Sequence, residues 1–157
     1  MQTIENNGYI YFGEPPSINT KYYAKVYYKN GTSYHGYLMN GFKHGYGEKY
    51  ESNGNYRKGY FKDDALNGNG IFYCKAKEVY YIGNFTFGKL DGLISCFYDK
   101  KKKVIKKNFK MGVPIVEEKV IPIVKEVDAV EPVVVQKIIK KIKPTMINSI
   151  EIINKYS

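Results

Sequence analysis

Few residues in this chain have the type and spacing that chemistry would need. Its two histidines, His35 and His44, lie nine residues apart, and no further metal ligands accompany them at suitable spacing. Its two cysteines, Cys74 and Cys96, cannot form a disulfide framework or a four-ligand metal site, so we expect small core or strand residues. The pair Asp63-Asp64 is typical of a turn. We therefore expect no enzyme activity, no cofactor and no metal.

Charge is the second chemical feature of the sequence. Lys and Arg total 25 against 15 Asp and Glu, a net charge of +10, yet Arg57 is the only arginine. Seven lysines gather within eleven residues: Lys100, Lys101, Lys102, Lys103, Lys106, Lys107 and Lys110. They fit a solvated turn followed by a lysine-protected edge strand, or a patch for an acidic membrane surface. The near absence of arginine, which supplies bidentate phosphate and base contacts, argues against nucleic acid.

The composition indicates one small β domain. The 157 residues include 15 Gly, 17 Tyr and no Trp, and 43% are hydrophobic, which favours a packed core of short strands and tight turns. The start has no secretory signal, and no stretch reaches the roughly 20 apolar residues that span a bilayer. We therefore expect an intracellular protein without a transmembrane segment.

Glycines and large side chains recur every 23 or 24 residues. The recurring glycines are Gly36, Gly45, Gly47, Gly59, Gly68, Gly70, Gly83, Gly88, Gly92 and Gly112. One side-chain column is Tyr27, Tyr50, Tyr73 and Phe97, and a second is Leu38, Phe61, Phe85 and Phe109. A third column is Tyr11, Tyr34, Arg57, Tyr81 and Ile105. Several columns with one period indicate an internal repeat.

Each repeat is interpreted as a β-hairpin. The pairs Asn30-Gly31 and Asn53-Gly54 recur at one phase, and Asn-Gly between aromatic segments predicts a type I′ turn. One hairpin is marginally stable, so neighbouring units must bury their rings side by side. The sequence therefore predicts an all-β fold, either an elongated single sheet or a solenoid of stacked hairpins. Tyrosines that recur in phase are read as core residues, which argues against base stacking.

The repeat resembles a known family. Tyr34-His35-Gly36, Gly41 and Gly45-Tyr46-Gly47 match the MORN repeat, and the units beginning at Asn84 and Asn108 look closer to its antitoxin-like variant. The resemblance runs from about Tyr11 to Gly112, although the usual tryptophan position holds Leu or Phe. It implies a rod of stacked hairpins and binding to acidic phospholipids.

Three regions are predicted along the chain. Residues 1–33 form a degenerate repeat or cap, 34–112 carry the repeats, and 113–157 form a Val/Ile/Lys-rich tail interrupted by four prolines. The tail is expected to be extended before Pro132. From 133 to 143 a basic amphipathic helix or a strand can form, and the helix would place on one face Val135, Ile138, Ile139 and Ile142. A second helix is expected from 145 to 155.

Several functional hypotheses follow from these features. The tail must bury its apolar residues by packing along the open end of the repeats, by docking into another protein, or by lying on a membrane. The leading hypothesis is a non-catalytic scaffold that assembles with a protein partner or with itself through the tail. The alternatives are a peripheral membrane module that uses the lysine patch, and an antitoxin-like protein binder.

Overall fold

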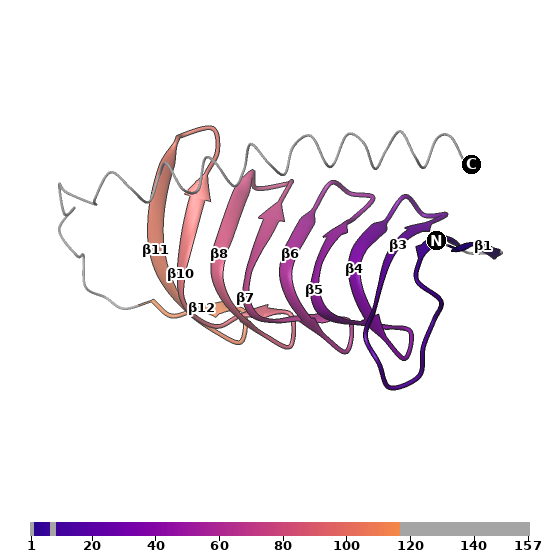
Figure 1. Cartoon of the computed structure of the whole chain (residues 1–157). Coiled ribbons are helices and arrows are strands. Elements are labelled where there is room, and N and C mark those ends of the chain that lie inside the picture. The colour runs from indigo at the N-terminus through magenta and orange to yellow at the C-terminus, as the bar shows by residue number, and fades with distance from the viewer. Residues whose placement is uncertain (1, 7–8, 117–157) are drawn as a thin grey trace.

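A single antiparallel sheet makes up the described part of the chain. The computed structural model describes residues 2–6 and 9–116 (Figure 1). The twelve strands are β1 (Gln2–Asn6), β2 (Tyr9–Gly13), β3 (Tyr22–Tyr28), β4 (Ser33–Met39), β5 (Phe42–Tyr50), β6 (Tyr56–Lys62), β7 (Ala65–Cys74), β8 (Val79–Thr86), β9 (Lys89–Leu90), β10 (Gly92–Tyr98), β11 (Lys103–Lys110) and β12 (Val113–Pro114). The expected tail elements lie outside these residues.

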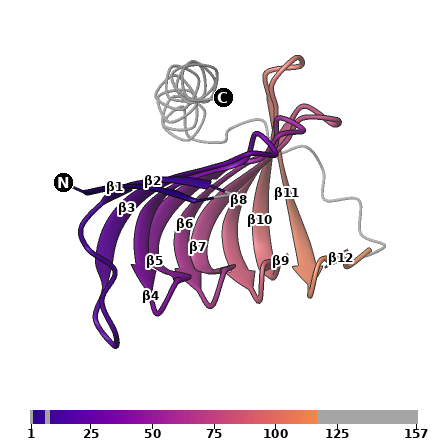
Figure 2. The same cartoon turned by 90° about the vertical axis from the view of Figure 1, so that its right-hand side faces the viewer.

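The strands follow one another across the sheet in chain order. Each strand from β1 to β8 pairs with the next, β8 then pairs with both β9 and β10, and β11 and β12 complete the series. The predicted all-β architecture of consecutive hairpins is confirmed, in its single-sheet form. Figure 2 shows the same row of strands from the side. Because each strand contacts its chain neighbours, the fold grows in one dimension.

The two faces of the sheet differ. On one, the glycine face, six small residues stand opposite one another on six adjacent strands: Ala24, Gly36, Gly47, Gly59, Gly70 and Gly83. On the other, the tyrosine face, six rings form the buried row, defined as Tyr27, Tyr50, Tyr56, Tyr73, Tyr80 and Phe97. Strand alternation assigns neighbouring residues to opposite faces.

The glycine row lets large side chains lie flat on the sheet. A Cβ at Gly47 would stand 2.3 Å from the Tyr34 hydroxyl oxygen, and one at Gly83 would stand 2.7 Å from Cδ1 of Ile94. Real Cβ atoms do not approach other atoms so closely, so these positions exclude any side chain. The repeat glycines are therefore explained by packing against a ring or a branched side chain.

A second glycine column marks where the strands change register. Gly45 and Gly68 have φ of +105° and +97° and lie where the pairing of β4 with β5, and of β6 with β7, shifts. Gly92, with φ of +87°, begins β10 and is separated from the end of β9 by one residue. Such bulges bend a strand, and glycine allows the left-handed conformation without strain.

Type I′ turns occur at positions that the sequence argument did not assign to them. Within residues 9–116, both central residues have positive φ in four turns: Asn40-Gly41, Asp63-Asp64, Phe87-Gly88 and Met111-Gly112. Each later turn donates a backbone hydrogen bond to the preceding unit, as Gly88 does to the Leu66 carbonyl (2.8 Å) and Gly112 to that of Leu90 (2.8 Å). The interpretation of Asp63-Asp64 as a turn is confirmed.

The prediction of type I′ turns at Asn30-Gly31 and Asn53-Gly54 is wrong. Only the glycine of each pair has positive φ. Gly31 donates its amide to the Tyr28 carbonyl (3.0 Å), which gives a type I turn followed by a left-handed glycine. The asparagine stabilises the turn through its side chain, because the Asn30 side-chain oxygen accepts the Thr32 amide (2.9 Å) in an Asx turn.

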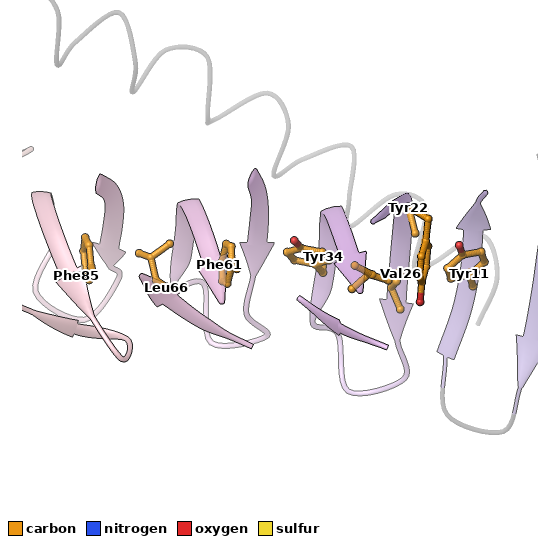
Figure 3. Packing of buried hydrophobic residues seen from close by; sticks show 9 residues of the cluster. Tyr11, Tyr22, Val26, Tyr34, Phe61, Leu66 and Phe85 are labelled. Atoms are coloured by element: carbon orange, nitrogen blue, oxygen red, sulfur yellow. The ribbon is translucent and has the colours of Figure 1, made fainter. Parts of the chain in front are cut away.

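The recurring side-chain columns build the core. Leu38, Phe61 and Phe85 pack with Tyr34 and Leu66 in one cluster on the glycine face (Figure 3). The fourth member, Phe109, is buried in a neighbouring cluster with Ile94 and Cys96. On the tyrosine face, the predicted alignment of Tyr50, Tyr73 and Phe97 is confirmed, and Tyr56 and Tyr80 stand between them.

Candidate functional site

Four tyrosines on the tyrosine face are open to solvent. The exposed strip is defined as Tyr23, Tyr37, Tyr46 and Tyr60, whose exposed fractions run from 38% to 57%. Tyr23 on β3 stands opposite Tyr37 on β4, with ring centroids 5.7 Å apart. Tyr46 on β5 stands opposite Tyr60 on β6, at 5.5 Å. Both pairs meet edge to face, a favourable geometry for aromatic rings.

The position of the strip follows from strand alternation and from the glycines. Tyr46 and Tyr60 directly neighbour the facing pair Gly47 and Gly59, so they point away from the glycine face. On the next two strands the same row continues with Asn69 opposite Asn84. The aromatic surface therefore covers four strands and then becomes polar.

A shallow hollow of about 520 Å³ adjoins the strip. It is lined by Tyr46, Lys58, Gly59, Tyr60, Asn69, Gly70, Ile71, Ile82 and Gly83. The Lys58 ammonium lies 5.9 Å from the centre of the Tyr46 ring and pairs with the Glu48 carboxylate. Burial alone would lower the pKa of Lys58, but the hydrogen bond and charge of Glu48 hold the pKa above its ordinary value. The hollow thus combines apolar side chains with one fixed ion pair.

His35 lies on the tyrosine face between two rings of neighbouring strands. Its ring centroid is 5.3 Å from that of Tyr27 and 5.7 Å from that of Tyr50. Burial, reinforced by the nearby Lys25 charge, lowers the pKa of His35 to about 4. A neutral imidazole between two rings acts as a packing residue. His44 instead lies 3.6 Å from the Asp63 carboxylate at the turn edge.

The cysteines sit on the glycine face. Cys74 is half-buried and Cys96 is buried, and both are free thiols. Burial raises the pKa of Cys96, which keeps it protonated and unreactive at neutral pH. Within residues 9–116 no three His, Cys, Asp or Glu side chains gather closely enough to hold a metal ion.

Arg57 interrupts the third side-chain column for a visible reason. Its guanidinium lies 4.5 Å from the centre of the Phe72 ring and pairs with the Glu51 carboxylate. Lys49 on the adjacent strand pairs with the same carboxylate at 3.1 Å. A planar cation can stack where the other units place a ring. Arg57 therefore packs in the column as a ring would, and it also brings a positive charge.

The lysine cluster divides between two places. Lys100, Lys101 and Lys102 lie in the turn between β10 and β11, and the other four lie in β11 itself. Alternation along β11 places Lys103 and Lys107 on the glycine face and Lys106 on the tyrosine face. Lys100 pairs with Glu78 and Lys102 with Asp99, both at 2.8 Å. These lysines therefore do not share one flat surface, and membrane binding stays a prediction.

The remaining predicted binding residues lie outside the described part of the chain: Val135, Ile138, Ile139 and Ile142. The sequence argument missed the exposed strip, although a signal was present. Tyr23 and Tyr46 are 23 residues apart, and so are Tyr37 and Tyr60. Recurrence was interpreted as burial, and for these four tyrosines that interpretation is wrong.

Comparisons with known proteins do not place the chain in a family. No family model matches the chain, and no curated protein matches it. The likeness to the MORN repeat therefore rests on the residues quoted for it. None of the described residues belongs to a helix long and apolar enough to cross a membrane.

Proposed function

We propose that this chain is a non-catalytic scaffold that binds a protein partner through the exposed strip. The observation that carries the proposal is the set of four solvent-exposed tyrosines on four adjacent strands. Tyrosine is enriched at protein interfaces because its ring buries a large apolar area while its hydroxyl still bonds to polar groups. A partner with apolar anchors flanked by hydrogen-bonding groups fits this surface.

The surroundings of the strip support a protein partner. The rings are held in edge-to-face pairs on a continuous sheet, so little side-chain freedom is lost on binding. The adjoining hollow offers room for an anchoring side chain, with Ile71 and Ile82 as apolar walls. The Lys58–Glu48 pair at its margin can orient polar groups of the partner.

Affinity purification of the tagged full chain from its native source tests the proposal. A protein that co-purifies in fixed ratio is then mixed with the purified chain to measure the dissociation constant. Replacing Tyr37 and Tyr60 by Ser should weaken binding at least about tenfold, because two exposed anchors of an interface are lost. This double variant, called the strip variant, changes two exposed side chains and keeps the buried core intact.

Phe87→Asn is the matched control. Phe87 is an exposed aromatic at the turn after β8, away from the strip. Its replacement should leave the dissociation constant unchanged. The proposal would be contradicted if the partner bound the strip variant as tightly as the natural chain. It would also be contradicted if the strip variant and Phe87→Asn weakened binding equally.

A further inference from the structure

The exposed strip consists of two pairs of rings at a fixed spacing. Tyr23 meets Tyr37 across β3 and β4, and Tyr46 meets Tyr60 across β5 and β6. Because neighbouring strands lie about 4.8 Å apart, the second pair stands two strands, or about 9.6 Å, from the first. All four rings are exposed. The strip therefore offers two aromatic contacts to a bound chain that runs across the strands.

This spacing matches the repeat of the polyproline II helix. That helix has three residues per turn and rises about 3.1 Å per residue, so its side chains return to one edge after about 9.3 Å. A bound strand returns a side chain to the same face after about 6.7 Å. An α-helix does so after one turn of about 5.4 Å or two turns of about 10.8 Å. The polyproline II repeat is the closest of these to the spacing of the ring pairs.

The hydrogen-bonding groups of the row favour the same conformation. A polyproline II backbone makes no internal hydrogen bonds, so its carbonyl groups are available to donors, whereas those of an α-helix are bonded within the helix. A tyrosine hydroxyl can donate to such a carbonyl while its ring packs against a proline. Asn69 and Asn84, which continue the row on β7 and β8, are exposed and add amide donors. The surface therefore suits a backbone with unbonded carbonyls.

Exposed lysines stand at both ends of the strip. A Cβ at Gly45 would lie 3.2 Å from Cβ of Tyr37 and 3.7 Å from Cδ of Lys21, so the Lys21 side chain extends beside the first ring pair. Lys62 follows Tyr60 by two residues on β6, and alternation therefore puts it on the same face beside the second pair. Within residues 9–116 neither lysine pairs with a carboxylate. These charges favour a bound segment with acidic residues at both ends.

We propose that the exposed strip binds a proline-rich segment in the polyproline II conformation, flanked by acidic residues. Two prolines three positions apart pack against the two ring pairs, and the tyrosine hydroxyls donate to carbonyls of the segment. Acidic residues beyond the prolines pair with Lys21 and Lys62. Because the strip is also the surface of the proposed function, this assignment of the partner's chemistry rests on that function.

Titration of the full chain with two synthetic peptides of identical composition tests the assignment. In the first peptide, Pro stands at every third position among Ala residues, with Glu at both ends. In the second, the same prolines stand at every second position, which turns successive prolines to different edges of a polyproline II helix. Dissociation constants from NMR titrations should show that the first peptide binds at least about tenfold more tightly, because only its prolines reach both ring pairs.

Variants of the chain locate the binding. The strip variant should bind the first peptide at least about tenfold more weakly, and Phe87→Asn should bind it unchanged. Lys21→Gln with Lys62→Gln should weaken binding about threefold and reduce its dependence on salt, since two exposed ion pairs are lost. The matched control is Lys29→Gln with Lys75→Gln, two exposed lysines that follow the opposite ends of β3 and β7. It should bind as the natural chain does.

Other outcomes overturn the assignment. It is wrong if the two peptides bind equally, if neither binds, or if the strip variant binds the first peptide as tightly as the natural chain does. The proposed function fails by a different result, namely a co-purified protein that binds the strip variant unchanged. A protein that needs both Tyr37 and Tyr60, while the two peptides bind equally, would retain the scaffold function and remove the polyproline II mode.

Discussion

At Gly47 the absence of a side chain decides how closely a ring can approach the sheet. Gly47 lies under Tyr34, whose hydroxyl donates to the Tyr37 carbonyl at 2.9 Å. Burial raises the pKa of Tyr34 far above its ordinary value, so the phenol stays neutral. The glycine row is therefore a set of contact surfaces for particular side chains. Facing glycines share one partner: Tyr34 lies against Gly36 and Gly47, and Leu66 lies against Gly59 and Gly70.

Gly47→Ala should reduce the free energy of unfolding by about 2–3 kcal/mol, because the added methyl group overpacks a buried site. Its Cβ would meet the Tyr34 oxygen at 2.3 Å. Tyr34→Leu removes that oxygen together with Cζ and Cε2, which would stand 2.6 Å and 2.7 Å from the same Cβ, so the double variant should lose less stability than the two single variants added together. Urea unfolding of all four proteins measures this coupling. Strict additivity would show that the ring does not rest on Gly47.

His35 should make stability depend on pH. Its pKa is about 4 in the folded chain, against 6.5 for an ordinary histidine. Between these values the unfolded chain binds a proton that the folded chain does not, so stability falls as pH drops from about 6.5 toward 4. The groups that face the imidazole are Tyr27, Lys25 and Glu48 on the adjacent strands, together with Tyr50.

His35→Gln should remove that component. Between pH 7 and pH 4 the free energy of unfolding should fall by up to about 3 kcal/mol less in the variant than in the natural chain. Urea unfolding of both proteins at each pH measures this difference. Comparing the two proteins cancels the carboxylates and His44, which both contain. Parallel pH profiles would show that His35 is protonated as easily in the folded chain as in the unfolded one.

At the scale of elements, turns of one type recur where one hairpin meets the next. Asn40-Gly41 has the residues that a type I′ turn prefers, whereas Phe87-Gly88 places an aromatic residue at φ of +48°. The later turns still form because each is hydrogen-bonded to the preceding unit, as Gly88 is to Leu66. Tertiary contacts thus offset a poor local sequence.

Phe87→Asn should raise the free energy of unfolding by about 1 kcal/mol, because Asn tolerates the left-handed conformation better than Phe. Phe87 is mostly exposed, so little packing is lost. Thermal unfolding of this variant and of Phe87→Ala measures the effect. Alanine lacks the local side-chain hydrogen bonds of Asn and should give a smaller gain. Equal melting temperatures for the two variants would contradict a backbone origin.

For the whole molecule, an open sheet must protect its last long strand. Within the described chain, β12 pairs with β11 at Phe109 and Lys110, and the Asn108 carbonyl accepts the Ile115 amide (2.8 Å), so the stretch 103–107 presents its outer backbone edge. Lysines on such an edge oppose pairing with another copy, which agrees with the edge-strand interpretation of the cluster. The charge of this region thus has a structural use that is independent of any membrane.

Replacing Lys103 and Lys107 by Thr should promote association through β11, since threonine favours strands and carries no charge. Size-exclusion chromatography over a range of concentrations should show dimers or larger species. Lys62→Thr with Lys77→Thr makes the same change in charge away from the edge and should stay like the natural chain. Similar behaviour of both variants would assign the effect to net charge.

The sequence alone determined the repeat, the hairpin architecture and the buried columns. Glycines and rings at a spacing of 23–24 residues are compatible with few other folds. It did not distinguish Tyr50, which is buried, from Tyr46, which is exposed, because both recur with the same period. Strand alternation puts both on one face, but Tyr50 packs between the rings of His35 and Tyr56, whereas Tyr46 meets the exposed ring of Tyr60. That depends on contacts distant in sequence, which the tertiary structure alone fixes.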